Sequence, residues 1–529
     1  IVHMRQQLRT KRFGLVLGAG VGKPFGLPNW RELLRRIAED PQVNGVEVFW
    51  SLENKSPQES LAQMLFEHFR AGYCAKNGRE ETDILELERD VKRIWREIIH
   101  KNLYRDVPDN LEGRHPYLEE YLNIVRQSTM TVNYNFDDTI ERMLAAGRTE
   151  QERRRGLGYE TVWDATLQFR LNEGVIYHPN GFLPKNLLEG PSEDLIFSED
   201  SFADQLIASM TGHYVTLLHH FLKNTCLFIG VSLEDPTLRH LLRQNARINP
   251  GHYHYHVAFV KDATPIGPLQ RRAITASNFE TYNLITLFLN SQEIRALGRL
   301  INSNPQDMAN FAEEIGLDLK FCFYITGVPG ASKSTVSSFF RSLATFAEWP
   351  NPRLELLAKP FTELTASERE TVDSWVADQF GTKNRNLLTE TEGIHVIDRC
   401  PLDPLTFTPD GEWPGKAARL HRAISPGRSK RKIQAGHVIL LRGDEKVMAA
   451  RLRVGHKRGS PEYLAELHKS FQKIYSRPGT TELDTRGLSI HEVVKRVAHI
   501  IHMQDYQEAD LHGILLKTKD TNTVSSKLS

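Results

Sequence analysis

The sequence has few cysteines and no pattern that would join them. Only four occur in 529 residues, and no two form a C-x-x-C pair. They are Cys74, Cys226, Cys322 and Cys400. This spacing excludes a disulfide framework and a zinc ribbon with four thiolate ligands, so we expect no zinc. Scattered cysteines are typical of a reducing compartment, and we expect the protein to be cytoplasmic.

Two further features are missing, a long hydrophobic run and an excess of charge of one sign. No run of about 18 apolar residues occurs, so we expect no transmembrane helix and no membrane partner. The 67 basic and 66 acidic residues leave a formal net charge of +1. This balance argues against nucleic acid as the main partner, because such binding depends on basic residues that neutralise phosphates. Hydrophobic residues make up 40% of the chain and charged residues 25%, which rules out a fibre or a wholly disordered chain.

One local pattern occurs twice: a short apolar strand, a glycine-rich turn and then a helix. The first strand spans residues 13–17 and leads into Gly-Ala-Gly, and the second spans residues 321–326 and leads into Gly-Val-Pro-Gly. Each is typical of the first strand of an open α/β domain, where strand ends meet phosphate groups. The sequence therefore predicts an α/β fold with two nucleotide-binding domains. We expect a first domain over residues 1–300, a helical linker over 301–320, a second domain over 321–515 and a disordered tail over 516–529.

The first glycine turn does not fit a dehydrogenase. The dinucleotide fingerprint of those enzymes has a third glycine where this chain has Lys23. The fingerprint also needs an acidic residue at the end of a second strand, whereas Glu39 and Asp40 end a helix-like segment. A hydride-transferring Rossmann enzyme is therefore disfavoured.

Four short segments of the first domain form a larger pattern. Residues 18–30 read GAGVGKPFGLPNW, residues 135–138 read NFDD, residues 178–184 read HPNGFLP and residues 230–239 read GVSLEDPTLR. In this order the segments resemble the sirtuin-like proteins of bacterial defence systems. The resemblance implies a Rossmann-like, sirtuin-type domain that binds NAD+ and breaks its nicotinamide–ribose bond.

The resemblance implies catalytic roles for Asn135, Asp137 and His178. Asn135 would orient a water molecule or the ribose hydroxyls, and Asp137 would fix Asn135 or polarise the cofactor. His178 would act as general base beside an oxocarbenium-like transition state. The residues expected to hold NAD+ are Gly18, Ala19, Gly20, Pro28, Asn180, Gly230, Ser232 and Asp235. Taken singly, structural roles stay open: Asn135 and Asp235 are ordinary residues for a helix start, and His178 for a packed strand end.

The chain departs from the family pattern at two positions. Gly22 stands where serine is usual, and Asn180 stands where a histidine usually precedes glycine. His178 is the only histidine of that loop, so either it acts from a shifted position or the activity is weaker or altered. Sirtuin deacylases carry a four-cysteine zinc module that this chain lacks, which favours an NAD hydrolase that uses water.

The second glycine turn nearly matches the Walker A pattern. The residues expected to hold phosphate are Gly327, Gly330, Ser332, Lys333, Ser334 and Thr335. Backbone N–H groups of such a turn cradle phosphates, Lys333 would reach the terminal phosphates and Ser334 would bind Mg²⁺. Ser332 replaces the standard glycine, and a positive φ there would cost energy. We therefore expect ATP or another nucleotide with Mg²⁺ as the ligand.

Charged residues farther along complete a second resemblance. Asp398 and Arg399 follow a strand-like run, where Asp398 would hold Mg²⁺ or activate a phosphate acceptor and Arg399 would clamp a substrate phosphate. A structural ion pair between the two is the alternative. An arginine-rich segment follows, with Arg451, Arg453, Lys457 and Arg458. Together with the P-loop, these motifs resemble thymidylate- and deoxynucleoside-kinase-like proteins over residues 321–505.

The joined domains indicate an effector and a sensor. We expect an antiphage effector that hydrolyses NAD+ to nicotinamide and ADP-ribose and is gated by nucleotide binding at the P-loop domain. The expected partners are a nucleotide ligand or a phage-derived trigger, and further copies of the chain in a homo-oligomer. The alternative is an active nucleotide or nucleoside kinase whose sirtuin-like domain senses NAD+. A third possibility is a non-catalytic binding module, favoured if Asn180 and Ser332 mark decayed sites.

Overall fold

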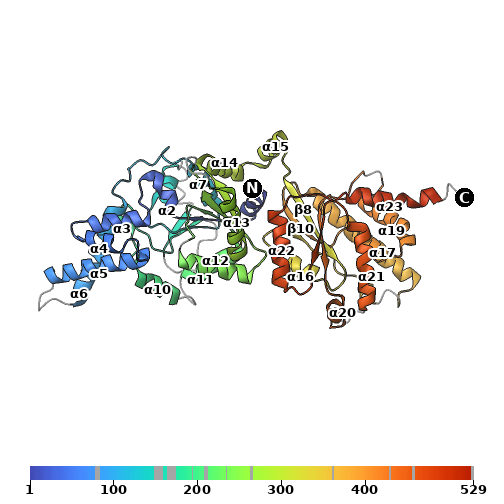
Figure 1. Cartoon of the computed structure of the whole chain (residues 1–529). Coiled ribbons are helices and arrows are strands. Elements are labelled where there is room, and N and C mark those ends of the chain that lie inside the picture. The colour runs from blue at the N-terminus through green and yellow to red at the C-terminus, as the bar shows by residue number, and fades with distance from the viewer. Residues whose placement is uncertain are drawn as a thin grey trace. The chain divides into compact units, whose positions relative to one another are not determined.

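The protein contains two α/β units (Figure 1). The structure is a computed structural model. It describes residues 1–77, 84–147, 159–163, 174–192, 195–207, 213–233, 235–261, 266–359, 363–427, 430–454 and 459–525. Unit 1 comprises mainly residues 3–248 and 253–304, and unit 2 mainly residues 305–529. In the described part of the chain, no helix combines the length and the apolar character needed to cross a membrane.

Unit 1 is built on a seven-stranded sheet with parallel neighbours throughout. Across the sheet the strands are β3 (Tyr159–Val162), β4 (Gly174–Tyr177), β2 (Met130–Asn133), β1 (Phe13–Leu17), β5 (Thr225–Ile229), β6 (His254–Phe259) and β7 (Leu284–Leu289). Leu17 of β1 is level with Asn133 of β2 and Ile229 of β5, so three strands end together. The strand order reverses at β1, and open α/β sheets bind ligands in the crevice beyond such a point.

The central strand β1 packs against apolar side chains on both faces. All five of its residues are buried. Leu15 and Leu17 belong to one apolar cluster and Val16 to another, because successive side chains of a strand point to opposite faces. The helices of unit 1 are α1 (Val2–Arg9), α2 (Ala19–Gly22), α3 (Trp30–Glu39), α4 (Val46–Leu52), α5 (Gln58–Asn77), α6 (Ile84–Leu103), α7 (Glu119–Gln127), α8 (Thr139–Ala146), α10 (Glu199–Ile207), α11 (His213–Lys223), α12 (Pro236–Ile248), α13 (Pro268–Tyr282) and α14 (Ser291–Asn302).

Unit 2 has a parallel sheet of five strands. Across it lie β12 (Thr480–Asp484), β11 (His437–Arg442), β8 (Lys320–Gly327), β10 (Gly393–Asp398) and β9 (Ala344–Phe346). Its helices are α15 (Pro305–Ile315), α16 (Lys333–Ser338), α17 (Ala366–Thr389), α18 (Asp403–Thr406), α19 (Trp413–Ile424), α20 (Glu445–Val454), α21 (Pro461–Tyr475), α22 (Ile490–Met503) and α23 (Leu511–Ser525). In Figure 1, α16 and α22 lie on one side of this sheet and α17 and α19 on the other. The middle strand, β8, leads directly into the second glycine turn.

The predicted fold class is confirmed: the chain is α/β, with a Rossmann-like sheet in unit 1 and a P-loop-kinase-like sheet in unit 2. The region expected to be a helical linker holds the end of α14, all of α15 and the start of β8. Residues 516–525, which were expected to belong to a disordered tail, form the second part of α23. Leu511 and Leu515 are buried on one face of α23 and anchor it. Residues 526–529 lie outside the described residues.

Candidate functional site

A cavity of about 1080 Å³ opens in unit 1 beyond the carboxyl ends of β1, β2 and β5. Small-molecule sites are typically about 300–1,000 Å³, so this one suits a ligand of dinucleotide size. Its wall includes the predicted residues Gly18, Ala19, Gly20, Pro28, Asn135, Asp137, Asn180, Gly230, Ser232 and Asp235. Of the residues predicted for unit 1, His178 alone is absent from the wall.

In the described part of the chain, five helices begin at this cavity. The first residues of α2, α3, α5, α10 and α12 line it: Ala19, Trp30, Gln58, Glu199 and Pro236. The N-terminal end of a helix carries a partial positive charge, so this arrangement favours an anionic group such as a pyrophosphate. Asn29 fixes the start of α3, because its side chain accepts a hydrogen bond from Glu32 N at 2.8 Å.

The glycines after β1 pack against the turn after β5. A Cβ atom on Gly18 would lie 2.6 Å from the Gly230 carbonyl oxygen, and one on Gly20 would lie 2.9 Å from Gly230 Cα. Gly230 has a φ of +68°, and its own Cβ would lie 2.6 Å from Val21 N. Close packing of the two turns is therefore enough to explain why glycine occupies these positions, in addition to the expected approach of a phosphate.

Both departures from the family pattern lie in the cavity wall. A Cβ atom on Gly22 would lie 2.7 Å from Leu27 Cδ1, so the usual serine would require Leu27 to move. Asn180 is buried, and its Nδ2 donates to the Tyr134 carbonyl at 3.3 Å. The position expected to hold a histidine thus holds an amide, which does not titrate.

Asn135 joins the turn after β2 to the turn after β1. Its Nδ2 donates to the Gly18 carbonyl at 3.1 Å, and its backbone N–H donates to Asn133 Oδ1 at 3.2 Å. The alternative role as a helix cap is not found, because α8 begins at Thr139 after Asp138. Asn135 is half-buried in the wall, where a ligand can reach its amide.

Asp137 is the buried carboxyl group beside Asn135. It is 2% exposed, and its Oδ1 accepts hydrogen bonds from the backbone N–H (3.1 Å) and the hydroxyl of Thr139. Burial raises the pKa of Asp137 to about 6, against the effect of the Thr139 bonds and with help from the nearby Asp138 and Glu141 carboxyls. A carboxyl group with such a pKa can exchange protons near neutral pH.

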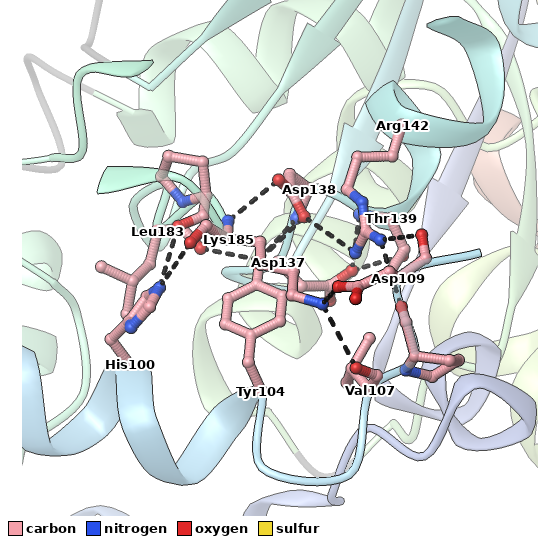
Figure 2. A network of polar contacts seen from close by, with 12 residues as sticks. His100, Tyr104, Val107, Asp109, Asp137, Asp138, Thr139, Arg142, Leu183 and Lys185 are labelled. Carbon is pink, nitrogen blue, oxygen red and sulfur yellow. Dashed lines mark hydrogen bonds and ion pairs between the residues drawn. The ribbon is translucent and has the colours of Figure 1, made fainter. Parts of the chain in front are cut away.

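A network of polar contacts holds the segment around Asp137 (Figure 2). The Tyr104 hydroxyl lies 2.9 Å from both Asp138 Oδ1 and the Leu183 carbonyl. Asp138 Oδ2 accepts from the backbone N–H of Lys185 at 2.9 Å. The network ties the segment after β2 to α6 and to the loop after β4. Tyr104 lies in no motif, so the sequence offered no signal for this role.

His178 lies behind the cavity wall, which corrects its expected place beside the ribose. It is fully buried; Nδ1 lies 2.8 Å from the Asn135 carbonyl and Nε2 lies 2.9 Å from Glu141 Oε1. Burial alone would lower the pKa of His178, but the Glu141 carboxylate outweighs it and the net shift is upward. With both ring nitrogens engaged, His178 supports the Asn135 backbone and does not face the cavity as a base. Asn180, two residues farther along the chain, lines the cavity.

Two predicted residues follow β5. Ser232 is exposed in the cavity wall, where its hydroxyl can meet a ligand. Asp235 Oδ1 accepts from Leu238 N at 2.8 Å, which is the geometry of a helix cap for α12. Burial raises the pKa of Asp235. This hydrogen bond supports the alternative in which Asp235 caps a helix.

The second glycine turn, in unit 2, has the backbone of a phosphate loop. Gly327 has a φ of +142° and Gly330 a φ of +85°. Ser332 has a φ of +62°, so the cost expected for a positive φ at this position applies. Lys333 is buried and its Nζ donates to the Val328 carbonyl at 2.9 Å. Burial and, secondly, Arg399 lower the pKa of Lys333 to about 7.

Arg399 does not pair with Asp398 as the structural alternative supposed. Its Nε donates to Glu348 Oε1 at 2.5 Å, and its Nη1 lies 3.7 Å from Asp403 Oδ2. Asp398 Oδ1 is buried and has no hydrogen-bond partner within the described residues. Glu348 escaped the sequence analysis because it follows β9, a strand of three residues. Asp403 stands five residues after Asp398 and had no motif of its own.

The remaining predicted residues of unit 2 belong to the turn itself or to the arginine-rich segment after β11. Ser334, Thr335, Arg451 and Arg453 are exposed. Lys457 and Arg458 lie outside the described residues. The expected Mg²⁺ ligands are the exposed Ser334 and the buried Asp398, whose Oδ1 has no hydrogen-bond partner in the described ranges. No group of three or more His, Cys, Asp or Glu side chains that could hold a metal occurs in the described ranges, so phosphate oxygens would have to complete the coordination shell.

Known proteins resemble parts of the chain. Residues 129–287 match the model of the SIR2-like domain family. A solved structure of deoxyadenosine kinase from M. mycoides, with products dCMP and a flexible dCDP bound, is 17% identical, covers 34% of this chain and 96% of its own, and has a TM-score of 0.26. A similarity at that level does not identify a substrate. A search of curated proteins found no match.

The SIR2-like segment contains one half of the cavity wall. It includes Asn135, Asp137 and Asn180 as well as the turn after β5, whereas the Gly18 turn precedes it. SIR2-like domains use NAD+ and are commonly NAD-dependent enzymes. The cavity at the reversal of strand order and the helix N-termini that line it fit such a ligand.

Proposed function

We propose that unit 1 hydrolyses NAD+ to nicotinamide and ADP-ribose. The observation that carries the proposal is that Asn135 and Asp137 line the same dinucleotide-sized cavity as the start of α12. The helix N-termini would meet the pyrophosphate. Ser232 would contact a ribose hydroxyl.

The reaction breaks the bond between ribose C1′ and the nicotinamide nitrogen, and water supplies the new C1′–O bond. Positive charge develops on the ribose, as in other glycoside cleavages. Asn135 would orient the water or the ribose hydroxyls, and the Asp137 carboxylate would accept the proton that the water loses. Nicotinamide leaves as a neutral molecule with the electron pair of the broken bond. The products are nicotinamide, ADP-ribose and a proton.

Nicotinamide release from NAD+ by the purified chain tests this proposal. We expect Asn135→Ala and Asp137→Asn to abolish release. Asp109→Asn is a matched control, because Asp109 is an exposed carboxylate outside the cavity that bonds Lys185. Nicotinamide release that persists in Asn135→Ala contradicts the site assignment. If the wild type releases no nicotinamide with any added nucleotide, the proposed hydrolysis is contradicted.

We further propose that nucleotide binding at the P-loop of unit 2 gates this hydrolysis, and that the protein is a cytoplasmic, oligomeric antiphage effector. The phosphate-loop backbone and the buried Lys333 support nucleotide binding. The test compares nicotinamide release with and without added nucleotides, in the wild type and in Lys333→Ala. A nucleotide effect that persists in Lys333→Ala contradicts gating at this loop. NAD+ that stays constant in infected cells expressing the protein contradicts the antiphage role.

A kinase activity of unit 2 is the second candidate. It is supported by Glu348 and Arg399, which pair with each other near the orphaned Asp398 carboxyl. A carboxylate there could accept the proton of a nucleoside hydroxyl. Transfer of labelled phosphate from ATP to nucleosides, lost in Glu348→Gln, would favour this candidate. Absence of both nicotinamide release and phosphoryl transfer would favour a binding module.

A further inference from the structure

The phosphate loop of unit 2 departs from its pattern at Ser332, and that residue makes a specific contact. A φ of +62° is unfavourable for any residue with a Cβ atom, and glycine would adopt it freely. The Ser332 hydroxyl accepts a hydrogen bond from Arg451 Nη1 at 2.9 Å. The same nitrogen lies 3.3 Å from the Gly330 carbonyl. The side chain that strains the loop therefore also tethers an arginine to it.

Arg451 is well placed to meet a phosphate on this loop. It lies on α20, which packs against the loop so closely that a Cβ atom on Gly330 would lie 3.0 Å from the Met448 carbonyl. The guanidinium has five N–H groups. Its Nε and Nη2 make no hydrogen bond to any residue that the structure describes. Since Arg451 is exposed, these donors remain accessible to an arriving anion.

We propose that Ser332 is a positioning residue that holds Arg451 over the phosphate loop, ready for the polyphosphate of a nucleotide. An untethered arginine loses side-chain freedom when it binds a ligand, whereas a tethered one has less to lose. The energetic cost of the strained Ser332 backbone is thus offset by an arginine that is already positioned to bind phosphate. This inference rests on the proposed nucleotide binding at the P-loop.

The decisive experiment restores the standard glycine. Calorimetry measures the binding of Mg-ATP and of inorganic tripolyphosphate, which lacks a base, to the full chain. We expect Ser332→Gly and Ser332→Ala each to weaken the binding of both ligands by about five- to tenfold, because the freed Arg451 side chain must then be immobilised on binding. Arg451→Ala should weaken them at least as much, and Ser332→Gly should have no further effect in that background. Lys446→Ala removes another exposed charge of α20 and should bind as the wild type does.

The outcomes separate the inference from the function on which it rests. A Ser332→Gly variant that binds as tightly as the wild type, or more tightly, overturns the positioning role. Losses that add in the double variant overturn it as well. If the wild type binds neither ligand, or Lys333→Ala binds both normally, the nucleotide site itself is wrong and the inference fails with it. Thermal unfolding of each variant verifies that the loop changes leave the fold intact.

Discussion

Asp137→Asn should remove catalysis and raise stability at the same time. Burial disfavours the charged carboxylate and raises the pKa of Asp137 from 3.8 to about 6. The folded state therefore binds the proton more tightly than the unfolded state, and stability falls as the pH rises from about 4 to about 6. At about 1.36 kcal/mol for each pKa unit, the ionised group costs about 3 kcal/mol above that range. Asparagine avoids this cost, and its Oδ1 can still accept both hydrogen bonds from Thr139.

Urea unfolding of the wild type and of Asp137→Asn at about pH 4, 6 and 8 measures this difference. The variant should match the wild type at about pH 4, gain stability as the pH rises and level off above about pH 6. Asp109→Asn is the control, because Lys185 lowers the pKa of that exposed carboxyl and its loss should give no gain. A gain of equal size at all three pH values would refute the reasoning, since it would not depend on ionisation. A loss of stability at about pH 8 would refute it too.

Three further predictions concern residues that support the structure of unit 1. His178→Ala removes the partner of the buried Glu141 carboxylate, so thermal unfolding should show a loss of stability of about 3–5 kcal/mol. In the nicotinamide-release assay, kcat should fall and should change more than KM, because Asn135 loses the contact that supports its backbone. Gly22→Ser forces Leu27 to move and should cost about 1–3 kcal/mol in the same assay. Arg5→Ala removes hydrogen bonds from Nη1 to the Leu300 and Ser303 carbonyls at the end of α14, at 2.6 and 2.8 Å, and should cost about 1–3 kcal/mol. Unchanged unfolding midpoints would contradict each of these packing arguments.

The fold class could be predicted from the sequence because short local patterns indicate it. The buried strand β1 is a continuous apolar run, and β8 is another, each followed by its glycine turn. The short strand β9 could not be predicted, because its three residues are not fully buried and pair only with β10 at the sheet edge. The length of α23 was missed for a similar reason: the polar residues near its end gave no sign of the anchor at Leu511 and Leu515.

The cavity wall was predictable where a motif and a turn coincide. Gly18, Asn135 and Ser232 each follow a strand of the same sheet, and parallel strands bring their carboxyl ends to one edge. Tyr104 and Glu348 were not predictable, since each reaches its partner from a distant segment without a motif. Sequence order places residues along the chain, whereas these contacts depend on how helices and loops pack.

For His178 and Asn180, the sequence could not predict which side chain faces the cavity. Both residues stand in one short loop, and the titratable side chain was the natural choice for a base. The structure turns His178 inward against Glu141 and leaves Asn180 in the wall. In the proposed hydrolysis, proton transfer is therefore assigned to Asp137, whose pKa is raised to about 6 by burial. Activity should therefore decline as the pH falls through about 6, and that dependence should vanish from any residual activity of Asp137→Asn while it persists in His178→Ala.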